Sequence, residues 1–432
     1  MSGMWNLSEL YSGPHDPAIE QDMLEAERQV AKFVAKWKSR TDYLESPAVL
    51  RVALDEYEAL FRGVGMGSRP TYFFTLSRAI NQSNAELKGL QSSLHWRSTV
   101  MSESLQFFGL SIGELSQSMQ DTMLTAVETA PYHVWLKHRF EKASHDLSEE
   151  MQSVVNRLLP LATESWRSLL DGLLSNDTAK IVLDGEEKSV PFNALSRYLV
   201  SDDSKLAKQA NDEHVRIARR HSTVAEHELN AVITAKIRMS ELRGYDRPDS
   251  ESFERNLVTS EIVESMLSTI EQRYAISHGV YDLKAQLFGR EILGYHERVL
   301  TYGTLPSGYT FEQGSTLLRG VFDTLHPKFA AEFDRVLANG HIDHTPRIGK
   351  RGGAACWHSA ITLPPYLLLS FTGALQDIQT LGHEFGHYLN NLYMQSGGKC
   401  DSLTYGAPTP LAEVASTFFE EYVLDHIVRD KG

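Results

Sequence analysis

The stretch Gly382-His383-Glu384-Phe385-Gly386-His387 carries the motif H-E-x-x-H within residues 373–390, whose pattern predicts a helix. Residues four positions apart share one face of an α-helix, so His383 and His387 can point two imidazoles at one metal ion. Glu384 lies beside the first histidine, where it can reach a water on the metal without binding the metal itself. Two neutral nitrogen ligands, an open position for water and a carboxylate that accepts a proton are the requirements of zinc-assisted peptide hydrolysis.

The same motif also has a purely structural interpretation, a surface helix with two spaced histidines. Gly382 and Gly386 bear on this choice, because each costs a helix about 1 kcal/mol relative to alanine. Glycines four positions apart in a helix usually mark close approach by another helix or by a substrate backbone. The other side of the helix is apolar and is expected to face the core: Ile378, Leu381, Phe385 and Leu389.

A catalytic zinc site needs a third protein ligand, and the next predicted helix offers one. Thr409-Pro410 is a favourable helix start, with threonine as the N-cap and proline in the first turn. A polar stripe follows at positions i, i+3, i+4 and i+7: Glu413, Ser416, Thr417 and Glu420. A solvated face would explain the stripe, but this helix has no Lys or Arg before Arg429. We therefore predict Glu413 as the third metal ligand and Glu420 as a carboxylate that supports a ligand from behind.

Two motifs together, H-E-F-G-H at 383–387 and A-E-V-A-S-T-F at 412–418, resemble the oligoendopeptidase F family, relatives of thimet oligopeptidase and neurolysin. The resemblance favours the peptidase interpretation over the surface helix, because it runs through nearly the whole chain. The further segments that resemble the family are 5–7 (W-N-L), 242–246 (L-R-G-Y-D), 342–343 (I-D), 349–354 (G-K-R-G-G-A), 365–371 and 377–382.

The resemblance implies a mainly α fold, in which two helical lobes enclose a deep substrate channel and a small β-sheet lies near the active site. It also implies short, unfolded peptides as substrates. Residues 180–190 form a hairpin pattern around Asp184-Gly185, a turn suited to positive φ, and a 39-residue helical stretch follows at 204–242. We place the domain boundary here: residues 1–195 are the N-terminal helical lobe, and 196–432 are the catalytic zinc-peptidase domain.

Strands are expected near the site between Gly352 and Phe371. An exposed strand edge there would pair with an extended peptide, which the resemblance also implies, and Gly353, Ala354 and Ala355 are the predicted substrate-binding residues. A small structural hairpin is the alternative. The nearby basic cluster of Arg347, Lys350 and Arg351 either attracts a peptide carboxylate or is simply solvated.

Composition limits the remaining possibilities. The chain has 432 residues, of which 42% are hydrophobic and 23% charged, as in ordinary globular proteins with more than one domain. The net charge of −14 argues against nucleic acid and anionic membranes as partners. Two cysteines, Cys356 and Cys400, suggest idle thiols rather than a disulfide framework, and no signal peptide is visible at the start. We expect a cytoplasmic protein.

The predicted function is therefore a metalloendopeptidase with one Zn²⁺ per chain, held by His383, His387 and Glu413, with Glu384 as the general base. One departure from the family concerns the end of the chain, because Gly432 follows soon after Glu413. Family members continue further and there supply the His and Tyr groups that stabilise the reaction's oxyanion, a role assigned to no residue here. The sequence therefore also allows a truncated fragment that binds zinc and peptide with weak or no turnover.

Overall fold

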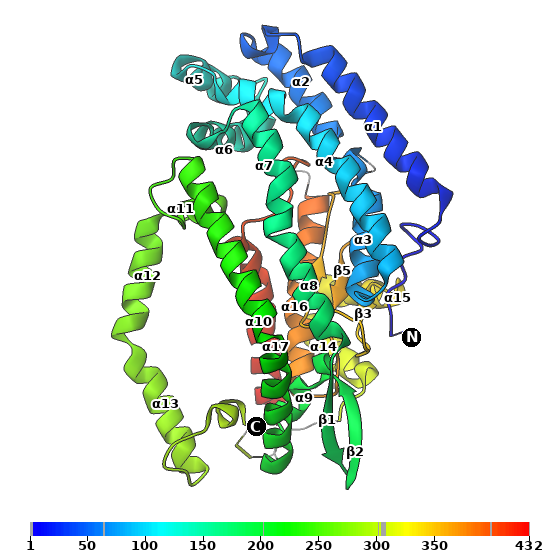
Figure 1. The fold of residues 1–432 in the computed structure, drawn as a ribbon, viewed down its shortest axis with the longest axis vertical. Helices are drawn as coiled ribbons and strands as arrows, with labels where there is room; N and C mark the ends of the chain where they lie inside the picture. The colour runs from blue at the N-terminus through cyan, green and yellow to red at the C-terminus, as the bar shows by residue number, and fades with distance from the viewer. Residues whose placement is uncertain are drawn as a thin grey trace.

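Helices make up most of the chain in the computed structural model, which describes residues 3–63, 65–201, 203–300, 302–303, 308–397 and 400–431. The strands described are few and short, in one two-stranded and one three-stranded sheet. The predicted mainly α fold with a small sheet is confirmed (Figure 1). None of the described helices combines the length and the apolar character needed to span a lipid bilayer.

The N-terminal helices pack around one aromatic-rich core. Asp16 caps the first of them by accepting a hydrogen bond from the backbone N–H of Ala18, and Pro17 lies in the first turn. Phe33 and Phe108 meet edge to face in the core, with ring centroids 5.2 Å apart. The helices are α1 (Pro17–Trp37), α2 (Pro47–Ala59), α3 (Ser68–Ile80), α4 (Ala85–Gly113), α5 (Gln117–Thr125) and α6 (His133–Lys142).

The middle of the chain contains the predicted hairpin and the predicted long helix. Asp184 and Gly185 adopt φ of 54° and 80°, so the turn has the left-handed backbone that the Asp-Gly pair favours. The first strand of the hairpin, β1, lies against the long helix, α10. The elements are α7 (Glu149–Ala162), α8 (Glu164–Asn176), β1 (Thr178–Leu183), β2 (Glu186–Pro191), α9 (Ser196–Leu199) and α10 (Ser204–Leu242).

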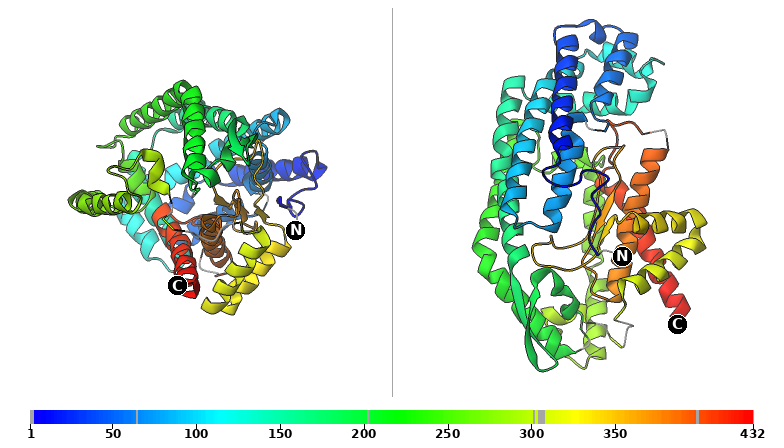
Figure 2. Two further views of the ribbon diagram at one scale, coloured as in Figure 1. Left: turned by 90° about the horizontal axis from the view of Figure 1, so that it is seen from below. Right: turned by 90° about the vertical axis from the view of Figure 1, so that its right-hand side faces the viewer.

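The remaining helices form an outer arm and a second packed layer. Figure 1 shows α12 and α13 standing apart from the other helices, whereas α14 to α17 pack together in Figure 2. The arm comprises α11 (Ser250–Arg255), α12 (Ser260–Gln272) and α13 (Tyr274–Leu287). The second layer comprises α14 (Phe311–Leu325), α15 (Pro327–Ala338), α16 (Leu375–Ser396) and α17 (Thr409–Lys431).

The three-stranded sheet joins the two main cores. Its order is β3 (Ile342–Asp343), β5 (Tyr366–Leu368), β4 (Ala355–Trp357), with β3 parallel and β4 antiparallel to β5. Side chains alternate along a strand, so Tyr366 and Leu368 enter the N-terminal core while Leu367 enters the core of α14–α17. The expected strands near the site are thus present, and β4 lies at an edge of the sheet.

The sequence predicts that the basic cluster next to the sheet is either solvated or attracts a peptide carboxylate. For Lys350 both predictions are wrong. This side chain is fully buried, and its Nζ lies 2.6 Å from Asp343 Oδ1 and donates to Leu369 O at 2.5 Å. Arg347 binds the same carboxylate at 2.8 Å. These two cations therefore neutralise a buried aspartate at the end of β3, and Lys350 is neither solvated nor free to bind a peptide carboxylate.

Candidate active site

Helices α16 and α17 cross so closely that only glycine fits at the crossing point. A Cβ on Gly386 would lie 2.7 Å from Ser416 Cα and 2.7 Å from Ala415 O, and one on Gly382 would lie 3.0 Å from Val423 Cγ2. The two glycines in the motif thus allow the close approach by another helix that their spacing predicted. As a result, the backbone of α17 lies directly against the turn of α16 that carries the histidines.

Three side chains converge across this crossing. His383 Nε2 and His387 Nε2 lie 3.5 and 3.4 Å from Glu413 Oε2, and the three candidate ligand atoms all lie within 4.8 Å of one another. A tetrahedral ion with ligands at 2.0–2.1 Å separates neighbouring ligand atoms by roughly 3.4 Å. Two nitrogens and one carboxylate oxygen at this spacing fit a catalytic zinc ion, and the structure brings together the three residues predicted to hold it.

The candidate ligands are oriented by further hydrogen bonds. His383 Nδ1 lies 2.8 Å from Glu420 Oε2, so the proton is held on Nδ1 and Nε2 is free to bind a metal. Ser416 Oγ donates to Glu413 Oε2 at 2.6 Å and is itself fully buried. Glu420 lies one helical turn beyond Ser416 on α17, behind the candidate ligands, as the polar stripe predicted.

Glu384 occupies a different environment from the other carboxylates. Its side chain is buried, and Oε2 has no hydrogen-bond partner among the residues that the structure describes. Burial, and then the negative charge of Glu413, raise its pKa to about 8, while the backbone N–H of Cys356 opposes that rise. A cation held by the neighbouring ligands would favour the ionised form. A carboxyl group with a free oxygen beside the candidate metal ligands is suited to accept a proton.

The backbone of β4 faces this carboxyl group. Leu367 N donates to His341 O on the β3 side, so Tyr366 and Leu368 direct their backbone groups to β4. Their partners Trp357 and Ala355 are thereby paired, and Cys356 between them turns its N–H and C=O to the other edge, where the N–H interacts with the Glu384 carboxyl group. No strand of the described residues pairs with this edge of β4, so the Cys356 C=O beside Glu384 is a suitable contact for an extended peptide.

The predicted substrate-binding residues lie at the start of this edge. Gly353 is exposed with φ of 80°, Ala354 is half-buried, and Ala355 is the first residue of β4. Because Ala355 pairs with Leu368, the outward backbone groups at this point of the strand belong to Cys356, which the sequence analysis did not select. Residues 354–359 alternate along a predicted strand, so the sequence indicates that neighbouring residues turn to opposite sides. The sequence did not reveal which side of the strand is paired.

Two more side chains near the histidines were not selected from the sequence. His358 follows β4, and its pKa is lowered by burial and by His387 nearby. The Tyr405 ring meets His358 edge to face with centroids 5.6 Å apart, and its hydroxyl accepts from Gln395 Nε2 at 3.1 Å. Both residues come from connecting segments, where no periodic pattern marks them.

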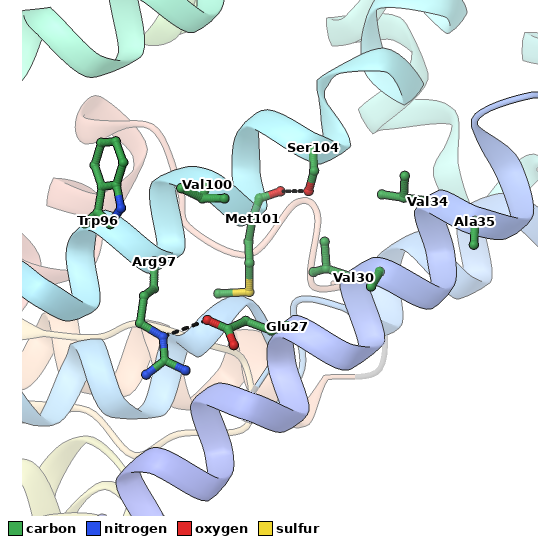
Figure 3. Close-up of a pocket in the computed structure, with 10 residues that line it drawn as sticks. Glu27, Val30, Val34, Ala35, Trp96, Arg97, Val100, Met101 and Ser104 are labelled. Carbon is green, nitrogen blue, oxygen red and sulfur yellow. Dashed lines mark hydrogen bonds and ion pairs between the residues drawn. The ribbon is translucent and has the colours of Figure 1, made fainter.

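A cavity between two N-terminal helices is a weaker candidate for the site. It measures about 590 Å³ and lies between α1 and α4, where Arg97 Nε binds Glu27 Oε1 at 2.7 Å (Figure 3). Its other lining residues are largely apolar, among them Val30 and Met101. None of its lining residues belongs to α16, α17 or β4, so we place the candidate active site at the helix crossing instead.

Comparison with known protein families and relatives gives a consistent result. The model of Peptidase family M3 matches residues 196–431. An oligoendopeptidase F homolog of Borreliella burgdorferi is 19% identical over 439 residues, covering 99% of this chain and 70% of that protein. Oligopeptidase PepF of Bacillus subtilis is 22% identical over 332 residues, covering 74% of this chain and 48% of that protein.

Solved structures show the same fold. Oligoendopeptidase-F from Enterococcus faecium superimposes with a TM-score of 0.64 at 15% identity, covering 95% of this chain and 67% of that one. At this identity the likeness concerns the fold. The chain spans between about half and 70% of the length of the relatives named here.

Proposed function

Because this chain belongs to peptidase family M3, we propose that it is a zinc-dependent endopeptidase that hydrolyses internal bonds of short, unfolded oligopeptides. The observation that carries the proposal is the convergence of His383, His387 and Glu413 across the α16–α17 crossing, with Glu384 buried beside them. Names of relatives such as oligopeptidase PepF support the substrate class.

In this proposal His383, His387 and Glu413 hold the zinc ion, and Glu420 fixes the tautomer of His383. The ion, when bound, supplies an acidified water and polarises the scissile carbonyl group. Glu384 accepts one proton from the attacking water and returns it to the leaving amine, so its protonation state is the same before and after the cycle. Its Oε2, which none of the described residues hydrogen-bonds, is the oxygen we assign to this transfer.

The open edge of β4 is the proposed binding surface for the peptide backbone. Main-chain hydrogen bonds to the Cys356 C=O, beside Gly353, Ala354 and Ala355, would hold an extended peptide without reading its side chains. Such binding suits a peptidase that accepts varied short substrates. We further propose that residues 1–195 form a lobe that covers the catalytic part from 196 onward and encloses a channel between them. The start of the family match at residue 196 supports that boundary. Two free cysteines support a cytoplasmic location.

A second candidate is a module that binds zinc and peptide without cutting. The observation that favours it is the set of three candidate ligands, which would hold a metal ion whether or not a peptide is cut beside it. The two candidates differ in whether peptide is consumed when the chain is in excess over substrate. A fluorogenic peptide with an internal quencher measures that single turnover directly.

The first experiment measures metal content after dialysis, for the chain and for His387→Ala. We expect about one zinc ion per chain and loss of that ion in the variant, because two ligands hold zinc much more weakly than three. Equal zinc content in both proteins would refute the assigned ligands. Zinc without single turnover would favour the binding module.

Glu384→Gln tests the general base. We expect zinc content to be unchanged and turnover to fall by roughly 10²–10⁴-fold, the usual range for loss of a general base. Glu421→Gln, at an exposed position of α17, is the matched control and should retain full turnover. A fall of less than about tenfold in Glu384→Gln would contradict the role we assign to this residue.

A further inference from the structure

A polar cavity of about 300 Å³ shares no lining residue with α16 or α17, which carry the candidate metal ligands. Most of its lining residues come from α4, α6, α7 and the C-terminal end of α10, helices that the reader can follow in Figure 1. Three cations line it, Arg139 and Lys142 from α6 and Arg243 at the end of α10, against the single carboxylate of Asp146. This excess of positive charge stands out in a chain with a net charge of −14.

Helix α4 leaves space for the Arg139 side chain. A Cβ on Gly113 would lie 2.6 Å from Arg139 Nη2, and one on Gly109 would touch its Cδ at 3.9 Å. Gly113 therefore leaves room for the guanidinium group, whereas a side chain at position 109 would only reach ordinary van der Waals contact with Arg139. The Arg139 side chain is 12% exposed and pairs with Asp146, while its Nε has no hydrogen-bond partner in the described part of the chain.

An unsatisfied amide also lines this cavity. Both Nε2 and Oε1 of Gln106 are buried and lack hydrogen-bond partners among the described residues. Leaving a buried polar group unpaired costs roughly 1–3 kcal/mol. A ligand that accepts a hydrogen bond from Nε2 would recover part of that free energy.

Arg243 and Lys142, two of the cations that line this cavity, have no anionic partner among the lining residues that the structure describes. Arg243 belongs to the segment 242–246 that resembles the oligoendopeptidase F family, and the proposed peptidase mechanism does not use it. Its guanidinium donates to His145 O at 3.1 Å and to Gln152 Oε1 at 2.7 Å, both neutral acceptors. No carboxylate of the described residues forms an ion pair with Arg243 or Lys142. Glu251 and Glu254 lie within electrostatic range of Lys142 but do not line the cavity.

We propose that this cavity binds a small phosphate compound carrying two or more negative charges. Guanidinium groups bind phosphate oxygens through paired, charge-assisted hydrogen bonds, and Lys142 at the mouth adds a point charge. A volume near 300 Å³ is at the lower end of small-molecule sites, which suits a compact phosphate compound better than a peptide. Arg243 lies within residues 196–431 and the other lining cations lie before it, so the bound anion would bridge the two parts of the chain.

The test titrates inorganic pyrophosphate into the full chain by isothermal titration calorimetry at constant ionic strength. We expect one saturable site per chain, weakened about tenfold or more in Lys142→Gln because a charge-assisted contact is lost. Lys137→Gln removes an exposed lysine of the same helix that does not line the cavity, and it should bind as the unchanged chain does. No saturable binding, or equal weakening in both variants, would overturn the proposal.

Two further variants distinguish pyrophosphate bound in this cavity from pyrophosphate bound at the zinc site. Pyrophosphate can also chelate zinc, so the titration is repeated with His387→Ala: retained binding supports the cavity, and lost binding refutes it. Gln106→Leu removes the unsatisfied amide at similar volume. We expect weaker pyrophosphate binding together with an equal or higher thermal unfolding midpoint, whereas unchanged affinity would contradict a role for Gln106 in the site.

Discussion

At the residue scale, the orientation of His383 depends on Glu420. The Glu420 carboxylate lies 2.8 Å from His383 Nδ1 and is the group that directs Nε2 toward Glu413 and His387. We expect Glu420→Ala to weaken zinc binding by roughly 10–100-fold, the usual effect of removing such a partner. Competition with a chromophoric chelator measures this affinity. Glu421→Ala is the control, and equal zinc affinity in the two variants would contradict the assignment.

The pKa of His344 makes the folding stability of the chain depend on pH. Its ring stacks on Phe311 with centroids 3.5 Å apart, and burial together with the charge of Lys350 lowers its pKa from 6.5 to about 4. Above pH 6.5 both the folded and the unfolded chain keep this ring neutral. As the pH falls from 6.5 to about 4, the unfolded chain takes up the proton first, so folding stability is lost over this window.

His344→Gln should remove this contribution. We expect the free energy of unfolding to fall less in the variant than in the unchanged chain between about pH 7 and about pH 5. Urea unfolding at the two pH values gives the change in the free energy of unfolding with pH for each protein. This change does not depend on the stacking energy that the substitution removes, because that energy is lost at both pH values. Equal changes in the two proteins would show that His344 does not titrate in this way.

At the element scale, the site depends on how closely α17 packs against α16. Gly386→Ala would place a Cβ 2.7 Å from the α17 backbone, so the helices must move apart. We expect a loss of about 1–3 kcal/mol in stability, as for overpacked cores, and a lower zinc affinity because Glu413 moves with α17.

Gly279→Ala is the matched control for this prediction. Gly279 also lies within a helix, α13, but a Cβ there would meet nothing within 4 Å. Alanine should therefore raise stability by up to about 1 kcal/mol, through helix propensity alone. Chemical denaturation and zinc titration of both variants test the contrast. A Gly386→Ala protein with unchanged zinc affinity would mean that the close crossing is not needed for the site.

At the scale of the whole molecule, the three-stranded sheet connects the two main cores, and Lys350 stabilises its end. Lys350 Nζ lies 2.6 Å from Asp343 Oδ1, and Trp5 Nε1 from the N-terminal segment donates to Leu367 O at 2.6 Å. We expect Lys350→Met to destabilise the fold by about 3 kcal/mol, because it leaves a buried carboxylate with Arg347 alone.

The control for Lys350 breaks an exposed ion pair. Arg319 Nε lies 2.9 Å from Asp334 Oδ2, and both side chains are about half exposed. Arg319→Met should therefore lower the free energy of unfolding by less than about 1 kcal/mol. Urea unfolding of the two variants gives both free energies. A Lys350→Met protein as stable as Arg319→Met would show that the buried pair contributes little net stability.

The sequence by itself determined the mainly α fold, the hairpin at 180–190, the helix at 204–242 and the set of residues proposed to bind metal. These features follow from local rules: helix periodicity, the Asp-Gly turn, and spacings of three, four and seven residues that put side chains on one face. The two glycines of the motif also indicated a close neighbour, although not which one.

Only the tertiary structure decided the distances and the environments. That Glu413 Oε2 lies within 3.5 Å of both histidines depends on the angle at which α17 crosses α16, and no local pattern sets that angle. The open edge of β4 at Cys356 and the burial of Lys350 likewise depend on which segments distant in sequence pack together. Burial changes the free energy of a charge by several kcal/mol, so the same residue types can be solvated, paired or catalytic according to what surrounds them.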